Sequence, residues 1–360
     1  MTDGIDFSDR KVAITGGAGS VGKAVIRHFQ EVGVGHLRVL DNSEAQLFDL
    51  EEQYRGVPNI EFFTCDVRSE TELERCFSDM DHVFHMAALK HVPLCERSPF
   101  SALDVNIAGS GSVIRAADRA GVRRVLFTST DKAVNPTNVM GTSKLMGERL
   151  FTAAASMGGR GNDRPVFAST RFGNVAGTSG SVIPLFAAQI ARGGPVTVTD
   201  ERMTRFVMTQ GHAARLVIDS IRYAHGGEVF ITKMPALRII DLAHEMIAVL
   251  APLYGHDPAS IEVRVTGSRP GEKLYEELST EEESRRIFEG DEYLVVLPAL
   301  APFEADEVTA RFADLNLEPT DRIYHSEHAE KMTGEEIRDF LMQEDVLPAD
   351  TLARLHASAT

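Results

Sequence analysis

The sequence predicts an α/β protein with a doubly wound parallel sheet, joined to a smaller C-terminal α/β domain. Three observations support this fold class. Short apolar runs at residues 11–15, 36–40, 60–65, 81–86 and 124–128 alternate with helical patterns through the first half of the chain, which is the order of a parallel sheet with crossover helices. A glycine-rich turn directly follows the first run. After Arg171 the elements become shorter and arginine becomes frequent in loops, as expected for a second domain in a chain of 360 residues.

The glycine-rich turn indicates the first ligand. Residues 16, 19 and 22 are glycines, and an amphipathic helical pattern follows them as far as Gly33. Glycine lets the backbone turn tightly and approach a pyrophosphate, and the free N–H groups at the helix start can bind it. Strand, turn and helix in this order predict a Rossmann-type dinucleotide-binding domain. The predicted contacts in the turn are Gly16, Gly19, Ser20, Val21 and Gly22.

An acidic residue after the second apolar run favours NAD as the dinucleotide. Asp41 lies nineteen residues after Gly22. A carboxylate there accepts hydrogen bonds from the adenosine ribose and repels a 2′-phosphate, so NAD is favoured over NADP. The alternative is that Asp41 merely starts a turn before an N-cap at Ser43. The other predicted contacts follow successive strands and are Asn42, Ser43, Asp66, Val67, Ala87, Ala88 and Thr128.

A polar stretch after the fifth apolar run predicts a reactive site. Ser129-Thr130-Asp131-Lys132 follows residues 124–128, and open α/β sheets bind their ligands at the carboxyl ends of strands. A helix is predicted at 139–157, with Met140 and Lys144 on one face. A hydroxyl, a carboxylate and two amines can therefore converge on one substrate. The plainer interpretation is that Asp131-Lys132 is an exposed turn pair and that Met140 is core packing.

A second long helix is predicted at 99–120, and Asn106 lies inside it. Asparagine is unfavourable in a helix interior, so we expect its side chain either to be exposed or to bond across to the active-site strand.

Domain boundaries follow from the change in composition. We predict that residues 1–171 and 206–237 form the NAD-binding domain, that 172–205 and 238–346 form the substrate-binding domain, and that 347–360 form a tail without a recognisable motif.

Composition excludes several classes of partner. The formal net charge is −16, which argues against nucleic acid and anionic membrane surfaces. Cys65, Cys76 and Cys95 lack zinc-site spacing, so we predict reduced thiols and no metal site. No apolar run approaches the about 18 residues of a transmembrane helix, and the first residues do not resemble a signal peptide. We therefore expect a cytoplasmic protein without a membrane segment.

The motifs together resemble those of extended short-chain dehydrogenases/reductases. The residues that carry this resemblance are the three glycines, Asp41, Asp66-Val67, Ala87-Ala88, Asn106 and Thr128-Ser129-Thr130. Within that family, residues 130–141, 171–175, 203–209 and 269–274 resemble the UDP-N-acetylglucosamine 4,6-dehydratases of bacterial glycan synthesis. The match covers roughly residues 10 to 340. It implies bound NAD, a UDP-sugar substrate and a homodimer or higher homo-oligomer.

The resemblance also implies roles for individual residues. Lys132 would be the base at sugar C5, its pKa lowered by nearby Lys144 and NAD+, and Asp131 the acid for the leaving C6 oxygen. Thr130 would hydrogen-bond the O4 hydroxyl, and Lys144 would bind the nicotinamide ribose. The predicted substrate contacts are Lys90, Asn174, Ser181, Val182, Arg205, Arg269 and Glu272. For Lys90 and Asn174 the alternative is loop solvation, and for the two arginines it is surface salt bridges.

One position departs from the general family. Short-chain dehydrogenases use a Tyr-x-x-x-Lys helix, but Met140 stands where the tyrosine would be, and a thioether cannot accept a proton. A subgroup of the 4,6-dehydratases that is thought to retain configuration at C5 is similar in this respect, so retention is expected. The alternatives are a C5-inverting dehydratase and a C4 epimerase. An epimerase would need the tyrosine base and has no need of Asp131-Lys132, so the sequence argues against it. A catalytically silent NAD-binding sensor or scaffold is a third.

Overall fold

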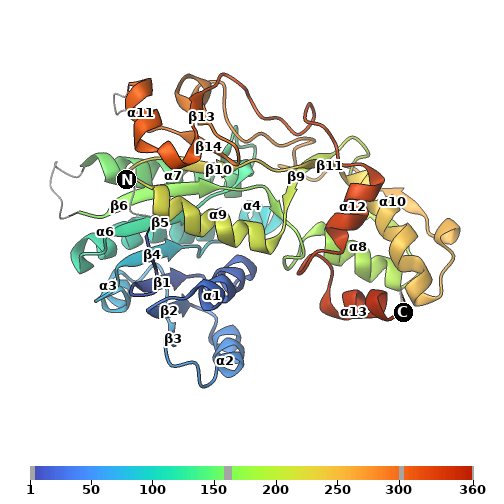
Figure 1. Ribbon diagram of the computed structural model, residues 1–360. Helices are drawn as coiled ribbons and strands as arrows, with labels where there is room; N and C mark the ends of the chain where they lie inside the picture. The colour runs from blue at the N-terminus through green and yellow to red at the C-terminus, as the bar shows by residue number, and fades with distance from the viewer. Residues whose placement is uncertain (1–4, 158–163, 300–303, 359–360) are drawn as a thin grey trace. The chain divides into compact units, whose positions relative to one another are not determined.

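The computed structural model describes residues 5–157, 164–299 and 304–358, and the chain divides into two compact units (Figure 1). Unit 1 comprises residues 1–172, 214–233 and 279–323, and unit 2 comprises 173–213, 234–278 and 324–360. This division differs from the predicted one in three respects. Residues 206–213 and 234–237, predicted for the NAD-binding domain, belong to unit 2. Residues 279–323 return to unit 1, and the end of the chain is part of unit 2 instead of a tail.

A ten-stranded, mostly parallel sheet forms the centre of unit 1, which confirms the predicted Rossmann-like fold class. The strand order is β15-β13-β14-β10-β6-β5-β4-β1-β2-β3. The run from β3 to β10 is parallel, whereas β14, β13 and β15 are antiparallel additions at one edge. The strands are β1 (Lys11–Thr15), β2 (His36–Asp41), β3 (Ile60–Thr64), β4 (His82–His85), β5 (Arg124–Thr128), β6 (Val166–Arg171), β10 (Val229–Thr232), β13 (Ile287–Glu289), β14 (Tyr293–Val296) and β15 (Glu318–Pro319).

Helices cover both faces of this sheet (Figure 1). The apolar sides of α3, α6 and α7 bury Leu73, Val113 and Phe151 against the strands, while Phe29 of α1 packs edge-on against Phe84 of β4. The helices and helical turns of unit 1 are α1 (Ser20–Val32), α2 (Glu44–Gln53), α3 (Glu70–Phe77), α4 (Val92–Arg97), α5 (Pro99–Ala102), η1 (Leu103–Ala108), α6 (Gly109–Ala120), η2 (Asp131–Ala133), α7 (Val139–Met157), most of α9 (Gln210–Tyr223), η5 (Glu283–Arg286), α11 (Ala305–Arg311) and η6 (Ala313–Leu315).

The predicted helix at 99–120 is helical throughout, but residues 103–108 do not form a regular α-helix. A π-helical turn, η1, separates α5 from α6 and contains Asn106. Such turns are rare and occur often at functional sites.

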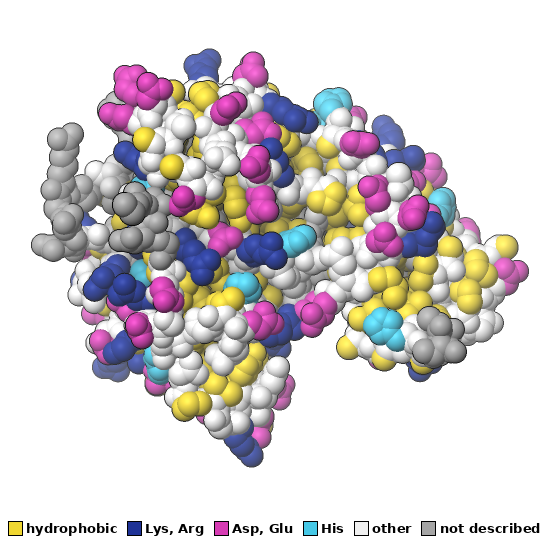
Figure 2. Space-filling model, in the orientation of Figure 1, with side chains coloured by type: hydrophobic (Ala, Val, Ile, Leu, Met, Phe, Trp, Pro, Cys, Tyr) yellow, Lys and Arg dark blue, Asp and Glu magenta, His cyan; other side chains and the backbone are white. Residues whose placement is uncertain are grey.

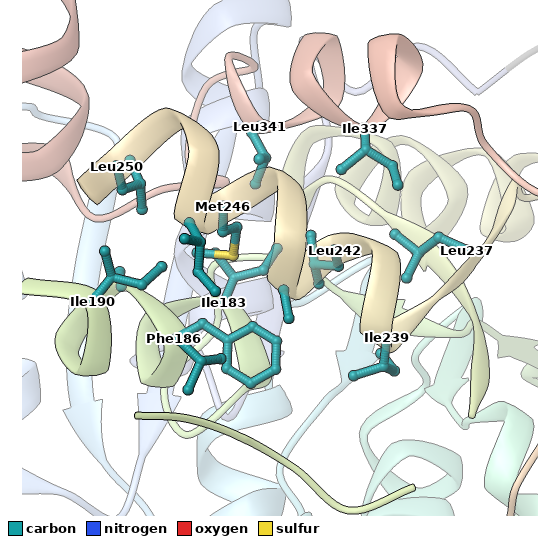
Figure 3. Packing of buried hydrophobic residues seen from close by; sticks show 14 of the residues in the cluster. Ile183, Phe186, Ile190, Leu237, Ile239, Leu242, Met246, Leu250, Ile337 and Leu341 are labelled. Carbon is teal, nitrogen blue, oxygen red and sulfur yellow. The ribbon is translucent and has the colours of Figure 1, made fainter. Parts of the chain in front are cut away.

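Unit 2 is a smaller α/β unit with its own core. It contains a three-stranded sheet, β11-β9-β7, and a two-stranded sheet, β12-β8. Figure 3 shows Phe186 of α8, Met246 of α10 and Leu341 of α12 packed in one buried cluster. The elements are β7 (Asn174–Val175), α8 (Val182–Ala191), β8 (Val196–Val198), β9 (Thr204–Met208), β11 (Ala236–Arg238), α10 (Ile239–Leu250), η3 (Ala251–Tyr254), η4 (Pro258–Ser260), β12 (Val263–Val265), α12 (Gly334–Leu341) and α13 (Ala349–Ser358).

The new places of residues 279–323 and of the chain's end have physical causes. β14 pairs antiparallel with β10 along four residues, so the 279–323 segment extends the sheet of unit 1. At the end of the chain, Leu352 and Leu355 of α13 pack against the core of unit 2.

The surface agrees with the acidic composition. Figure 2 shows acidic and basic side chains interspersed on the face that it draws. Among the described helices, none combines the length and the apolar character that a membrane crossing requires.

Candidate active site

The glycine turn between β1 and α1 is built so that side chains are excluded at two positions. Gly16 has φ +71°, and a Cβ there would lie 2.6 Å from the backbone N of Ala87. A Cβ at Gly22 would lie 2.5 Å from the carbonyl O of Gly17. Gly19 is the N-cap of α1, and no side chain caps the first turn, which begins with Ser20 and Val21. The turn therefore presents backbone N–H groups at a helix start, as an anion site requires.

Asp41 joins the end of β2 to this turn. Its Oδ2 accepts the backbone N–H of Ala18 (3.1 Å), and its Oδ1 accepts that of Ser43 (3.0 Å). Ser43 is the N-cap residue of α2 but makes no side-chain capping bond, and Asn42 is exposed. The carboxylate thus starts a turn, as the plainer interpretation held, and it also lies beside the glycine loop, where a ribose would be placed.

The residues after β3 and β4 line the same edge of the sheet. The Arg68 side chain binds the Asp66 carboxylate at 2.5 Å and lowers the pKa of that group. Val67 is buried. Ala87 lies against the glycine turn and approaches the Thr15 hydroxyl through its N–H (3.4 Å), and Ala88 follows as a second small residue.

Thr130, Asp131 and Lys132 form one hydrogen-bonded cluster at the end of β5. The Thr130 hydroxyl and the Lys132 ammonium both donate to Oδ1 of Asp131, each at 2.9 Å. Asp131 is fully buried, and no group of the described residues bonds to its other oxygen, Oδ2. The Lys132 side chain is 23% exposed. The pair is therefore not an exposed turn pair. It is a buried carboxylate, and one of its oxygens accepts hydrogen bonds from both a hydroxyl and an amine.

Lys144 places a buried amine beside this cluster's strand. Its Nζ donates to the carbonyl O of Thr128 (2.7 Å) and lies 4.5 Å from the centre of the Phe127 ring. Burial lowers the pKa of Lys144 to about 7, although the charge of Glu148 acts in the opposite direction. The amine can therefore change its protonation state near neutral pH.

Met140 is buried and packs with Cys95 and Ala102. Its environment is apolar, as the core-packing interpretation expected, and it supplies no proton acceptor.

Asn106 fits neither of the two alternatives expected from the sequence. It is 1% exposed. Its amide donates to the carbonyl O of Leu89 (3.0 Å) and to the Ser143 hydroxyl (2.8 Å), and its Oδ1 accepts the N–H of Leu89 (2.8 Å). The side chain therefore bonds to the loop that follows β4 and to α7, rather than to β5. This bonding fixes the backbone next to Lys90, which is exposed and whose pKa is lowered by desolvation.

His85 completes the buried polar layer under the strand ends. Its ring lies between the Thr15 hydroxyl (2.7 Å) and the Ser110 hydroxyl (3.1 Å). Burial, assisted by the charge of Lys144, lowers the pKa of His85 to about 3. The ring is therefore neutral near pH 7, and it ties β1, β4 and α6 together.

The remaining predicted substrate residues lie in unit 2. Asn174 donates to the carbonyl O of Phe206 (3.2 Å). Ser181 is the N-cap of α8, whose first residue is Val182. Glu272 accepts the backbone N–H of Arg269 (3.1 Å) in a tight loop, where the Arg269 side chain is exposed.

Arg205 differs from its prediction as a diphosphate ligand. Its guanidinium donates to the carbonyl groups of Thr204 (2.8 Å), Leu274 (3.2 Å) and Lys273 (2.8 Å), and Glu276 lies 3.6 Å away. The residue is 8% exposed. These acceptors already occupy its donors, so in this arrangement Arg205 holds the 273–276 segment to β9 and is no longer a candidate for binding phosphate.

One buried group escaped the sequence analysis. Arg171, the last residue of β6, binds the carboxylates of Glu148 and Glu283 at 2.7 and 3.0 Å. The only local signals were the placement of Glu148 four residues after Lys144 and an arginine ending an apolar strand.

Comparison with known proteins places this site in a family context. An uncharacterized membrane protein of Methanocaldococcus jannaschii is 45% identical over 81% of this chain and 87% of its own length. A UDP-N-acetylglucosamine 4,6-dehydratase (inverting) of Campylobacter jejuni is 35% identical over 83% of the chain and 86% of its own. A UDP-glucose 4-epimerase of Rickettsia bellii is 35% identical over 94% and 97%, respectively.

Solved structures share the fold. Pen from Bacillus thuringiensis superposes with a TM-score of 0.84 at 38% identity, over 94% of this chain and 98% of its own. A dTDP-glucose 4,6-dehydratase of Streptomyces venezuelae, solved with NAD bound, has a TM-score of 0.63 at 23% identity, over 73% and 86%. The family described as "Polysaccharide biosynthesis protein" matches residues 12–298. The chain belongs to this polysaccharide biosynthesis protein family.

Proposed function

We propose that this protein is an NAD-dependent dehydratase that converts UDP-N-acetylglucosamine to UDP-4-keto-6-deoxy-N-acetylglucosamine with retention at C5. The observation that carries the proposal is the buried cluster at the end of β5, where Thr130 and Lys132 share one oxygen of Asp131. A 4,6-dehydration needs a base at C5 and an acid at C6 on neighbouring atoms, and this cluster offers an amine and a carboxyl group side by side.

The residues at the glycine turn fit NAD. Side chains are excluded at Gly16 and Gly22, so a pyrophosphate can approach the backbone and the start of α1. The Asp41 carboxylate lies beside the turn and would accept the adenosine ribose hydroxyls, while Asp66 and Val67 would border the adenine. Lys144 and Thr128 would hold the nicotinamide ribose. When bound, NAD supplies the oxidising equivalent for C4 and the hydride that later reaches C6.

The Asp131–Lys132 pair supplies the acid and the base. The ion pair at 2.9 Å and the reactive pair, a neutral amine beside a carboxylic acid, differ only in the position of one proton. Transfer of that proton from Nζ to the carboxylate leaves Lys132 able to remove the C5 proton, which the C4 ketone has acidified. Asp131 then protonates the C6 oxygen, which leaves as water, and the Lys132 ammonium returns a proton to C5 on the same face.

Thr130 would transfer the remaining proton, that of the O4 hydroxyl. Its hydroxyl, which is fixed to Asp131, would bond the O4 hydroxyl and pass the O4 proton to solvent as C4 is oxidised. After one turnover the Asp131–Lys132 pair has lost one proton, and one from solvent restores it. Met140 takes no part in proton transfer, so O4 deprotonation depends on Thr130 and on the positive field of Lys144.

An epimerase is the second candidate, because a relative of equal identity carries that name. C4 epimerisation needs no acid at C6, and its usual base is the tyrosine that Met140 replaces. A C5-inverting dehydratase, as in the Campylobacter relative's name, could remove the C5 proton with the same cluster but would need a second proton donor on the opposite face of C5. Binding of a UDP-sugar by Arg269 and Glu272, and a homodimer or higher assembly, remain part of the proposal.

Proton NMR tests the proposal. The purified protein is incubated with UDP-N-acetylglucosamine in deuterium oxide without added NAD. We expect a new C6 methyl signal, deuterium at C5 and a C4 ketone or its hydrate. Retention is read from the H4–H5 coupling after the same conversion in ordinary water and reduction of the ketone with borohydride. A C4-inverted sugar without a methyl signal would establish the epimerase instead. An unchanged sugar, with NAD supplied and bound, would support the sensor interpretation.

A further inference from the structure

Three buried charges lie behind the candidate active site in unit 1. Arg171 is 1% exposed, Glu148 is 2% and Glu283 is 3% exposed. The guanidinium donates to both oxygens of Glu148, at 3.1 and 2.7 Å, and to both oxygens of Glu283, at 3.1 and 3.0 Å. Burying such a group is costly, and well-packed apolar residues often stabilise a fold as much or more. We therefore expect these three charges to have a function beyond stabilising the fold.

The group lies next to the site along two paths. Glu148 is four residues after Lys144 on α7, so both side chains are on one face of that helix. Arg171 directly precedes Phe172, whose carbonyl O accepts the backbone N–H of Asp131 (3.0 Å). Glu148 therefore lies on the helix that carries the Lys144 amine, and Arg171 adjoins the residue that binds the backbone of Asp131.

Glu148 is the natural ion-pair partner for Lys144, yet the two do not pair. No ion pair within 4.0 Å joins these two described residues; instead the amine donates to Thr128 and Arg171 takes both oxygens of Glu148. From the other elements packed near the amine, the titratable groups are His85 of β4, which is neutral, and Asp131 and Lys132 of η2, which pair with each other.

We propose that Arg171, balanced by Glu283, is a positioning residue that holds the Glu148 carboxylate away from the Lys144 amine, so that this amine stays on Thr128 and remains available to the cofactor. If Glu148 were released, its carboxylate would pair with the Lys144 ammonium and draw it away from the carbonyl O of Thr128. The consequence for catalysis rests on the proposed function, whereas the restraint itself does not.

The decisive variant is the double substitution Arg171→Gln/Glu283→Gln. It removes one positive and one negative charge, so the net charge of the group stays the same, but it frees Glu148. The pKa of Lys144 is read from its 13Cε NMR signal in lysine-labelled protein, assigned by its loss in Lys144→Arg. We expect a rise of about 1, a tenfold change in the ratio of ammonium to amine. An unchanged pKa in a folded double variant would overturn the proposal.

A second variant keeps the test usable if the double variant does not fold. Glu148→Gln conserves the shape of the side chain and one acceptor for Arg171, and it removes the charge. Because Arg171 already holds the carboxylate away from the amine, the proposal predicts only a small fall in the pKa of Lys144, well under about 1. The matched control is Glu282→Gln, which removes an exposed carboxylate paired with Arg286 at 2.7 Å, and it should leave the Lys144 signal unchanged. A fall of about 1 or more in Glu148→Gln that is absent from the control would show that the carboxylate already pairs with the ammonium, and it would refute the restraint.

The titration needs no turnover, so its failure is distinguishable from failure of the proposed function. If the sugar is never dehydrated but Lys144 responds as predicted, the restraint stands and the reaction is wrong. If the protein is active and Lys144 does not respond, only the restraint is lost.

Discussion

Asp131→Asn should separate the acid step from the base step. Asparagine keeps an oxygen in the place of Oδ1, so the Thr130 hydroxyl and the Lys132 amine retain an acceptor. At the position of Oδ2, which has no partner among the described residues, the variant places an amide that cannot donate a proton to a leaving oxygen. The loss should therefore be that of one general acid, about 100- to 10,000-fold in dehydration, or roughly 3–5 kcal/mol in the barrier.

The same variant should retain chemistry at C5. Lys132 is still in place and has lost its carboxylate partner, which makes the neutral amine easier to form. We expect UDP-N-acetylglucosamine recovered from deuterium oxide to carry deuterium at C5 without any C6 methyl product. Lys132→Met, the paired control, should abolish both exchange and dehydration. Dehydration within tenfold of the unaltered protein, or loss of C5 exchange in Asp131→Asn, would refute the assignment of acid and base.

Three further predictions follow from the geometry. Gly16→Ala should abolish NAD binding in calorimetry, because its Cβ would meet the backbone of Ala87. Gly33→Ala is the control: it also has a positive φ, but nothing lies within 4 Å of its Cβ, so it should bind NAD normally. An equal loss of NAD binding in the two variants would contradict this prediction. Because the pKa of Lys144 is about 7 when folded and ordinarily 10.5, the unfolded chain binds more protons between these values, and stability should rise with pH there by at most about 1.4 kcal/mol per pH unit. Urea unfolding at pH 7 and 9 should show a smaller rise in Lys144→Met. Finally, Arg269→Gln should raise KM for the UDP-sugar about tenfold or more, whereas Arg205→Gln should chiefly lower the melting temperature; a selective KM effect in Arg205→Gln would restore it as a phosphate ligand.

The parts of the fold that the sequence predicted are those with local signals. Strand, glycine turn and helix are adjacent in sequence, so the first β-α unit could be located from the residues alone. The cluster at Thr130, Asp131 and Lys132 is likewise made by three consecutive residues. Its burial could be expected only from its place after an apolar strand.

What the sequence did not predict depends on distant partners. Arg171 and Glu283 are 112 positions apart, and no local pattern relates them. Arg205 was a reasonable phosphate ligand until the 273–276 segment, about 70 residues later, was seen to occupy its donors. The return of residues 279–323 to unit 1 depends on the pairing of β14 with β10. The sequence of a short apolar strand does not indicate which strand it pairs with. In each case tertiary contacts override the local pattern.

A substrate labelled at C4 shows whether the oxidation and the reduction at the Asp131–Lys132 pair take place within one sugar molecule. UDP-N-acetylglucosamine carrying deuterium at C4 is converted by the protein in ordinary water, and the product is analysed by NMR and mass spectrometry. An internal hydride transfer is expected to carry the C4 deuterium into the C6 methyl group of the product. Deuterium that is lost to solvent during dehydration, or that remains on C4 of an epimerised sugar, would contradict it.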